Sequence, residues 1–371
     1  MKKVNWHFQR KDLAESYLQT VYQGAMSRIA LLDVRRTGKT TFLLKDLYPI
    51  AIENGFIPVY INLWGEPESP TVAITQALNN TLSILDETLK SKLSELANSE
   101  VKKLEVGNNV FGKAIIEFSD KHAHKPSESE LFKIGQLVEA LFNKCGDKAI
   151  IIIDEIQHLA SSDKFLPVQH ALRTALDTYS DICVVFAGSS RSGVNAMFSD
   201  KDKPFYDSAF MIDFPRLGEE FVQHCCKTLK VHFNLEYDVL AINDFYEEID
   251  KSPFWMMKLM TYLMAHKASL KEGTEYIKAL MVQDGDFEGL KKRLRALDVE
   301  VLHLIRQEET ALYSASIVDY LSNKVANEVT SSAIQTSVKK LKTMQVISQY
   351  GDRYYIESPG FIKYLEATLK V

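Results

Sequence analysis

Gly38, Lys39 and Thr40 form a short run whose residue types and order suit the binding of phosphate. They end the sequence Asp-Val-Arg-Arg-Thr-Gly-Lys-Thr at positions 33–40, directly after the apolar residues 29–32. In the pattern G-x-x-x-x-G-K-[ST], backbone N–H groups surround phosphate oxygens, the lysine reaches the β and γ phosphates, and the hydroxyl ligates Mg²⁺. The sequence therefore predicts a nucleotide-binding loop between a strand and a helix.

Asp33 occupies the first position of this pattern, where glycine is expected. Aspartate tolerates left-handed backbone conformations better than most residues, so the turn can form. A carboxylate near phosphates is nevertheless expected to weaken nucleotide affinity or to favour an Mg²⁺-bound form. The residues predicted to contact the nucleotide in this loop are Asp33, Arg35, Arg36, Thr37, Gly38, Lys39, Thr40 and Thr41.

Two carboxylates follow a second apolar run. Residues 148–155 read Lys-Ala-Ile-Ile-Ile-Ile-Asp-Glu, and such an unbroken β-branched run is typical of a strand buried on both faces. At its carboxyl end, Asp154 would hold Mg²⁺ opposite Thr40, and Glu155 would polarise the water that attacks the γ phosphate. The alternative is a buried strand followed by acids that cap a helix. The upstream phosphate-binding sequence favours the catalytic interpretation.

The residues after a third apolar run are candidates for sensing the γ phosphate. Residues 182–187 lead into Gly188, Ser189, Ser190 and Arg191. A polar side chain there can lie between the other two motifs, so we expect Ser189 or Ser190 to be the sensor, although serines are also common in turns. Arg191 is a candidate to meet a phosphate or a neighbouring subunit, or to face water.

These motifs need a sheet that brings several strand ends to one edge. Apolar segments alternate with helical stretches, which predicts an α/β fold with a parallel sheet covered on both faces. The expected strands are residues 28–32, 57–63, 148–154, 182–187 and 210–214. Residues 66–146 form an insert too long to be a bare loop. Within it, residues 74–98 have helical periodicity and residues 106–118 are expected to form a hairpin.

With these motifs in view, the chain resembles the archaeal-type P-loop ATPase family, which belongs with the STAND class of signal-transduction ATPases and is related to the origin-recognition initiators of the AAA superfamily. The likeness rests on residues 8–13, 35–40, 154–155, 189–198 with 204–206, and 251–254. The resemblance implies a P-loop NTPase core with ATP and Mg²⁺ as ligands. It also implies that Pro253 lies near the adenine.

The chain departs from the family pattern in two places. Asp33 replaces a glycine, and Asp207-Ser208 stands where the family has Gly-Arg after a tyrosine. An arginine that acts in trans is therefore missing at that place, and Arg216 or Arg191 is the candidate to replace it. Hydrolysis thus follows less directly from the sequence than nucleotide binding does.

After Pro215 the sequence changes from strands to helices. Helices are expected at residues 219–229, 239–249 and 253–267, and by resemblance they form a helical lid. The Met and aromatic residues of 254–264 have the spacing of a helix core more than of a nucleotide pocket.

Residues 291–371 follow the order of a winged helix. Helices at 299–306, 314–323 and 330–344 precede two alternating strands within 346–356, and the segment has 12 Lys or Arg against 9 Asp or Glu. The third helix leaves polar side chains outside that suit phosphates and base edges. The candidate DNA-binding residues are Gln335, Thr336, Lys339, Lys342 and Arg353. Winged helices also dock proteins, so protein docking is the alternative to duplex DNA.

Composition is consistent with a soluble protein of several domains. The 371 residues are 46% hydrophobic and 25% charged with a net charge of −5, which argues against a protein that coats nucleic acid uniformly. No signal peptide or membrane-spanning run is evident, so a cytoplasmic location without membrane contact is expected. The four cysteines lack metal-site spacing.

Together these features predict three parts: an ATPase core with its N-terminal segment and helical insert (residues 1–215), a helical lid (216–290) and a winged-helix domain (291–371). The predicted function is an ATPase that acts as a nucleotide-dependent switch on duplex DNA. Further expected partners are the product of an adjacent gene, as an effector, and other copies in a nucleotide-dependent oligomer. The alternative is a signalling or interaction protein that hydrolyses ATP weakly or not at all, with a structural nucleotide and a protein-docking winged helix.

Overall fold

The computed structural model describes residues 3–86, 123–284, 287–307, 309–325, 327–344, 346–350, 353–357, 360–361 and 364–365. The chain divides into two compact units. The first, which we call the sheet unit, comprises Gln9–Asp33 and Lys39–Phe214, and the second, the helical unit, comprises Met1–Phe8, Val34–Gly38 and Pro215–Val371. The hairpin predicted at residues 106–118, and the predicted helix beyond Asp86, lie outside the described residues.

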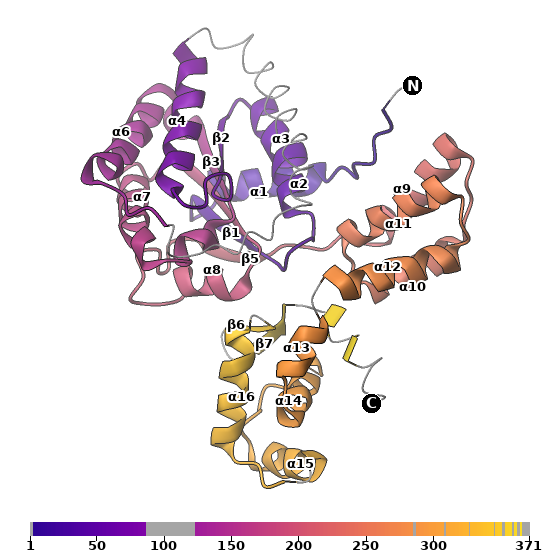
Figure 1. Ribbon diagram of the computed structural model, residues 1–371. Coiled ribbons are helices and arrows are strands. Elements are labelled where there is room, and N and C mark those ends of the chain that lie inside the picture. Colours follow the sequence, from indigo (N-terminus) through magenta and orange to yellow (C-terminus); the bar gives the residue numbers. More distant parts are fainter. Residues whose placement is uncertain are drawn as a thin grey trace. The chain divides into compact units, whose positions relative to one another are not determined.

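Five parallel strands form the centre of the sheet unit (Figure 1), as predicted. They are β1 (Arg28–Leu32), β2 (Ile57–Asn62), β3 (Ala149–Asp154), β4 (Cys183–Gly188) and β5 (Phe210–Asp213). Their order is β2-β3-β4-β1-β5, so β4 lies between the strand that precedes the phosphate-binding loop and the strand that ends in two carboxylates. Each observed strand begins and ends within one residue of its predicted bounds. The α/β fold class is therefore confirmed.

Alternate strand residues enter two separate hydrophobic clusters, one on each face of the sheet. Ile151 and Ile153 of β3 pack with α4 (Pro70–Asp86), α6 (Glu128–Cys145), α7 (Leu166–Thr178) and α8 (Arg191–Phe198). Ile150 and Ile152 pack on the other face with α1 (Lys11–Gln23) and the helices that follow β1 (Figure 1). Residues 150–153 are fully buried, which explains why both faces of this strand are β-branched.

The helix after β1 is continuous but changes its winding. It comprises α2 (Lys39–Phe42), the π-helical turn η1 (Leu43–Leu47) and α3 (Tyr48–Glu53). Its first residues are Lys39 and Thr40, so the phosphate-binding sequence ends at a helix N-terminus. Backbone N–H groups at such a terminus have no partner within the helix and attract anions.

The helical unit contains two hydrophobic clusters. The first is built from α9 (Glu219–Phe233), α10 (Val239–Glu248), α11 (Pro253–His266) and α12 (Leu270–Asp284). Trp6 stacks on Phe233 with ring centroids 6.0 Å apart, and Phe8 contacts Phe221 edge-on. Met256, Leu259 and Met260 of α11 are fully buried, so the Met and aromatic run is helix core, as its spacing indicated.

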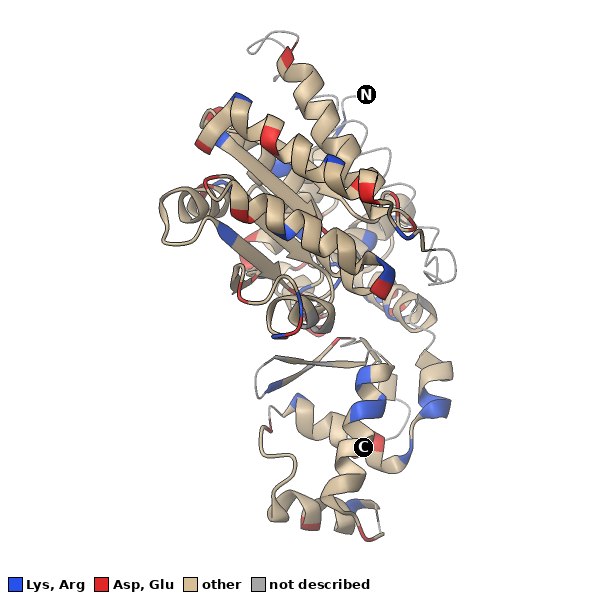
Figure 2. Cartoon of the chain, turned by 90° about the vertical axis from the view of Figure 1, so that its left-hand side faces the viewer, with Lys and Arg blue, Asp and Glu red and all other residues tan. Residues whose placement is uncertain are grey.

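The second cluster belongs to the C-terminal segment. Its elements are α13 (Phe287–Arg293), α14 (Ala296–Arg306), α15 (Ala315–Val325), α16 (Ser331–Thr343), β6 (Ile347–Tyr350) and β7 (Arg353–Ile356), with β6 and β7 antiparallel. The elements from α14 to β7 follow the predicted order of three helices and a hairpin. Lys and Arg residues occur on the helices of this segment (Figure 2).

The helices α1 and α12 are among the described helices that were not predicted individually. The buried residues of α1, which are Ala14, Tyr17, Leu18 and Val21, have helical spacing, so the signal was present in the sequence. Ile277 is the one large side chain of α12 in the buried core among the residues whose burial is described. Such a helix gives little apolar periodicity and is recognised mainly through its packing partners.

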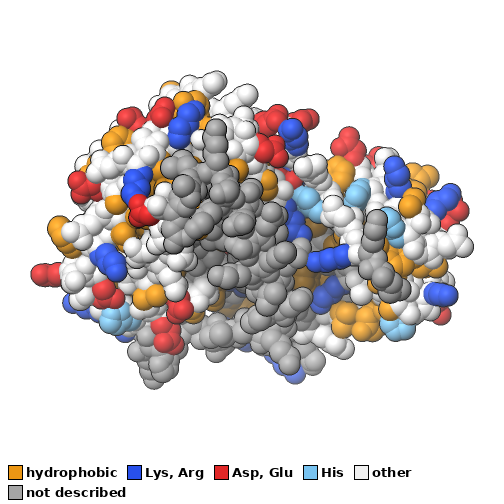
Figure 3. Space-filling model, turned by 90° about the horizontal axis from the view of Figure 1, so that it is seen from above, with side chains coloured by type: hydrophobic (Ala, Val, Ile, Leu, Met, Phe, Trp, Pro, Cys, Tyr) orange, Lys and Arg blue, Asp and Glu red, His pale blue; other side chains and the backbone are white. Residues whose placement is uncertain are grey.

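No helix among the described residues has both the length and the apolar character needed to cross a membrane. On the face drawn in Figure 3, acidic and basic side chains are interspersed, in keeping with the small net charge of −5.

Candidate functional site

The carboxyl ends of β1, β3 and β4 meet at one edge of the parallel sheet, as the strand order requires. Asp33 follows β1, Asp154 ends β3 with Glu155 directly after it, and Ser189 follows β4. Because β4 lies between β1 and β3, Ser189 lies between the two other groups. Its role as a sensor of the γ phosphate stays a prediction.

Lys39 is buried and faces back toward the start of its own loop. Its Nζ donates a hydrogen bond of 2.8 Å to the backbone carbonyl of Asp33, and only 6% of the residue is exposed. Asp33 is also buried. The Lys39 bond uses the backbone of Asp33, so this contact does not depend on which side chain stands at position 33.

Thr40 and Asp154 join the two motifs directly. Thr40 Oγ1 donates to Asp154 Oδ2 at 2.7 Å, and the Tyr60 hydroxyl donates to the same oxygen at 2.9 Å. Burial of Asp154 and the neighbouring charge of Glu155 raise the pKa of the Asp154 carboxyl to about 6, in spite of these donors. Asp154 is therefore a buried carboxyl whose charge is costly unless a cation accompanies it.

Glu155 and Ser189 form a second polar group beside the first. Ser189 Oγ donates to Glu155 Oε2 at 2.6 Å, and Gln157 Nε2 donates to the same oxygen. Glu155 has a left-handed backbone with φ of 59°, an uncommon conformation for a residue other than glycine. Such a conformation at the end of a strand is one way in which folds aim a functional side chain.

Residues Val34–Gly38, the middle of the loop, belong to the helical unit. There, Ser252 Oγ donates to the carbonyl of Arg36 at 3.2 Å, and the Arg36 guanidinium lies 4.5 Å from the ring centroid of Phe254. Arg36 has φ of 71°. A Cβ added to Gly38 would lie 3.8 Å from Pro253 Cγ. Pro253, which resemblance placed near the adenine, thus lies beside the loop glycine.

The other predicted loop residues differ in exposure. Arg35 and Thr41 are exposed, whereas Thr37 is buried and donates to the Val34 carbonyl at 3.1 Å. Arg191 is the first residue of α8, and its predicted role stays a prediction. Arg216 donates to both the carbonyl and the carboxylate of Asp250, so it is engaged within the helical unit.

Sequence reasoning missed Tyr60 and Gln157, which contact the two carboxylates of the site. Tyr60 reaches Asp154 because β2 and β3 are neighbours with Asn62 opposite Asp154. Gln157 reaches Glu155 and Ser189 from η4 (Ile156–Ala160), a turn of 3-10 helix. A tyrosine in a strand and a glutamine after two acids carry no motif, so only the pairing of strands reveals them.

The oxygen atoms of Thr40 and Asp154 fit a magnesium ion. Mg²⁺ prefers hard oxygen ligands and is usually bound by one or two protein groups together with substrate phosphates and water. A hydroxyl and a buried carboxylate 2.7 Å apart supply that donor set. The charge of the ion would also offset the cost of ionising Asp154.

The predicted DNA-binding residues of α16 lie on its exposed face. Ile334, Val338 and Leu341 are buried, as the helical spacing predicted. Gln335, Thr336, Lys339 and Lys342 are exposed, as is Arg353 at the start of β7. Lys342 donates to Gln349 of β6 at 3.1 Å.

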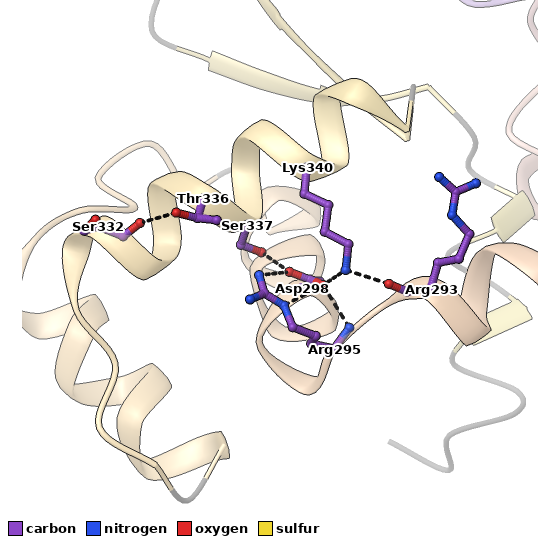
Figure 4. A network of polar contacts seen from close by, with 7 residues as sticks. All are labelled: Arg293, Arg295, Asp298, Ser332, Thr336, Ser337 and Lys340. Atoms are coloured by element: carbon purple, nitrogen blue, oxygen red, sulfur yellow. Dashed lines mark hydrogen bonds and ion pairs between the residues drawn. The ribbon is translucent and has the colours of Figure 1, made fainter.

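A buried carboxylate determines which face of α16 points inward. Asp298 of α14 is completely buried and accepts hydrogen bonds from Ser337, Lys340 and Arg295 (Figure 4). Burial by itself raises the pKa of Asp298, but the hydrogen bonds from Arg295, Lys340 and Ser337 outweigh it and place the pKa below its usual range. Lys340 and Arg295 therefore have structural partners, whereas the neighbouring Lys339 is directed outward.

No protein-family model matches the chain, and no curated protein matches it in sequence. Solved structures do match over almost the full length. The Walker-type ATPase PABY2304 of Pyrococcus abyssi is 18% identical with a TM-score of 0.58, and the match covers 96% of this chain and 95% of that one. The Aeropyrum pernix ORC2 protein in its ADP form is 12% identical with a TM-score of 0.54, covering 97% and 91%. The chain thus has the fold of archaeal Walker-type and ORC-type P-loop ATPases, as the resemblance predicted.

Proposed function

We propose that this chain is an Mg²⁺-dependent ATPase that works as a nucleotide-dependent switch and engages duplex DNA through residues 291–371. The main support for Mg²⁺-dependent ATP binding and hydrolysis is the hydrogen bond of 2.7 Å between Thr40 and Asp154, which joins the two motifs at one edge of the sheet. The name of one structural neighbour, a Walker-type ATPase, and the ADP bound to another support the same substrate class.

Each side chain at this edge has a distinct role in the proposal. The Lys39 ammonium binds the terminal phosphates, and Thr40 and Asp154 hold Mg²⁺. A Mg²⁺ ion held there would supply Lewis-acid chemistry at the phosphate oxygens. Glu155 accepts a proton from the attacking water. The Ser189 hydroxyl donates a hydrogen bond to a phosphate oxygen and so reports that the γ phosphate is present.

The nucleotide part is tested on the purified full-length chain. Calorimetry measures the affinity for ATP and for ADP with and without Mg²⁺, and steady-state assays measure phosphate release. We expect ATP binding that is tighter with Mg²⁺, and slow but measurable hydrolysis. Absence of ATP binding in both conditions refutes the assignment. Tight binding without any hydrolysis identifies the alternative function, an interaction protein with a structural nucleotide.

The DNA part is supported by the surface of the C-terminal segment. Its 12 basic residues exceed its 9 acidic ones, and α16 presents Gln335, Thr336 and Lys339 to solvent. Asp298 holds the opposite face of α16 through hydrogen bonds with Ser337 and Lys340. These contacts fix the rotation of α16 about its axis, and therefore which side chains face outward. Amide, hydroxyl and ammonium groups on one helix face match the chemistry of phosphates and base edges.

Fluorescence anisotropy of the full-length chain with labelled duplex DNA tests this part. The titrations are made at several salt concentrations with ATP and again with ADP. We expect the affinity to fall steeply with salt, because each phosphate contact releases counterions. No DNA affinity at low salt in either nucleotide state contradicts DNA engagement and favours protein docking. Equal affinity in both states contradicts the switch.

A further inference from the structure

Gln157 occupies the position between the proposed base and the proposed sensor. Its Oε1 accepts a hydrogen bond of 3.2 Å from the backbone N–H of Ser189. Because an N–H can meet only the oxygen of the amide, this bond fixes the orientation of the side chain. The amide nitrogen must then face Glu155 Oε2 and Ser189 Oγ, to both of which it donates.

Two glycines leave room for this side chain. A Cβ added at Gly188, the last residue of β4, would lie 2.7 Å from Gln157 Oε1 and 2.3 Å from Val194 Cγ2. A Cβ added at Gly193 in α8 would lie 2.7 Å from Gln157 Cβ. Glycine within a helix costs about 1 kcal/mol relative to alanine. The close approach of Gln157 supplies a reason for glycine at both positions.

We propose that Gln157 is a positioning residue of the ATPase reaction, which keeps the carboxylate of Glu155 and the hydroxyl of Ser189 in one hydrogen-bonded group. The inference rests on the proposed function, in which Glu155 is the base and Ser189 meets phosphate. It adds a third residue that touches neither water nor phosphate but sets the orientation of the two that do.

The Ser189 hydroxyl has a single proton, so it can donate a hydrogen bond to only one acceptor at a time. In the structure that acceptor is Glu155 Oε2, at 2.6 Å. When Ser189 turns to phosphate, Glu155 Oε2 loses this donor. Gln157 continues to donate to Oε2 and so keeps the carboxylate oriented.

Two variants remove the contact in different ways. Gln157→Leu deletes the amide, and Gly193→Ala displaces it by placing a methyl group against Gln157 Cβ. For both, we expect kcat to fall roughly 10- to 100-fold while the Kd for ATP changes less than about 3-fold, as for a misplaced catalytic group. Gly135→Ala is the matched control, because it makes the same change in α6 where no atom lies within 4 Å of the added Cβ. It should leave kcat unchanged.

The variant Gln157→Glu separates positioning from a merely structural role. It preserves the size of the side chain but replaces the amide nitrogen by an oxygen, so a carboxylate there cannot donate to Glu155 Oε2. We therefore expect kcat to fall in Gln157→Glu as it does in Gln157→Leu, with the Kd for ATP again changed less than about 3-fold. Melting temperatures of all variants are measured alongside.

The outcomes distinguish this inference from the proposed function beneath it. A parent chain that hydrolyses ATP, with Gln157→Leu at the same kcat, overturns the inference alone. So does a loss of ATP affinity that accounts for the whole effect, or a kcat of Gln157→Glu equal to that of the parent. A parent chain that binds ATP but releases no phosphate overturns both the inference and the catalytic part of the proposed function.

Discussion

The hydroxyl of Thr40 donates a hydrogen bond of 2.7 Å to the carboxylate of Asp154, although 114 positions separate the two residues in the sequence. The bond exists because β1 and β3 are parallel strands of one sheet and their carboxyl ends reach the same edge. It brings a hydroxyl from the phosphate-binding loop to a buried carboxylate.

Replacing Lys39 by methionine tests the phosphate-binding loop. Methionine keeps much of the buried aliphatic stem and removes the ammonium, so the fold should persist. Loss of a buried charged partner costs about 2–5 kcal/mol, so we expect the Kd for ATP in calorimetry to rise roughly 30-fold or more. Lys133→Ala on the exposed surface of α6 is the control. ATP binding by Lys39→Met at the parental affinity would show that the loop does not bind phosphate.

Glu155 and Asp154 should separate chemistry from metal binding. Glu155→Gln preserves shape but cannot accept a proton, so kcat should fall by about 10²- to 10⁴-fold while ATP remains bound. Asp154→Asn removes the charge that attracts the cation, so the gain in ATP affinity that Mg²⁺ provides should disappear. Single-turnover assays and calorimetry measure the two effects. Undiminished hydrolysis by Glu155→Gln would exclude Glu155 as the base.

The raised pKa of Asp154 makes a prediction about stability and pH. Its carboxyl titrates near 6 in the folded chain and near 4 when unfolded. The folded state therefore binds the proton more tightly, so this group stabilises the fold at low pH, and the contribution is lost as the pH rises through about 6. Asp154→Asn has no carboxyl at this position, so its stability does not fall in this way as the pH rises. In the absence of nucleotide and metal, the melting temperature of Asp154→Asn should therefore rise relative to that of the parent between pH 4 and pH 7. A constant difference would contradict the raised pKa.

Lys339 and Lys340 are neighbours on α16 with different expected roles. Lys339 is exposed, so Lys339→Ala should reduce by about one the slope of log affinity for DNA against log salt, with little change in melting temperature. Lys340 donates to buried Asp298, so Lys340→Ala should destabilise the C-terminal segment by roughly 1–3 kcal/mol. Anisotropy and thermal unfolding measure the pair. If the two variants behave alike in both assays, the assignment of the outward face is wrong.

The sequence by itself determined the central strands and the identity of the two motifs. Residues 150–153 are four consecutive isoleucines, and a strand without polar alternation has to be buried on both faces. Gly38, Lys39 and Thr40 are identified by their order alone, because a phosphate-binding loop is a local structure. The outward face of α16 was likewise predictable, since helical spacing places Ile334, Val338 and Leu341 together.

Only the tertiary structure decided which side chains meet around these motifs. Tyr60 contacts Asp154 because β2 pairs with β3, and Gln157 contacts Ser189 because β4 lies beside β3. The different surroundings of Lys339 and Lys340 depend on Asp298, which is 42 positions from Lys340. Local patterns report the periodicity of a helix or strand and the residues next to it in sequence. Contacts between distant segments are fixed by strand order and helix packing, which no single segment encodes.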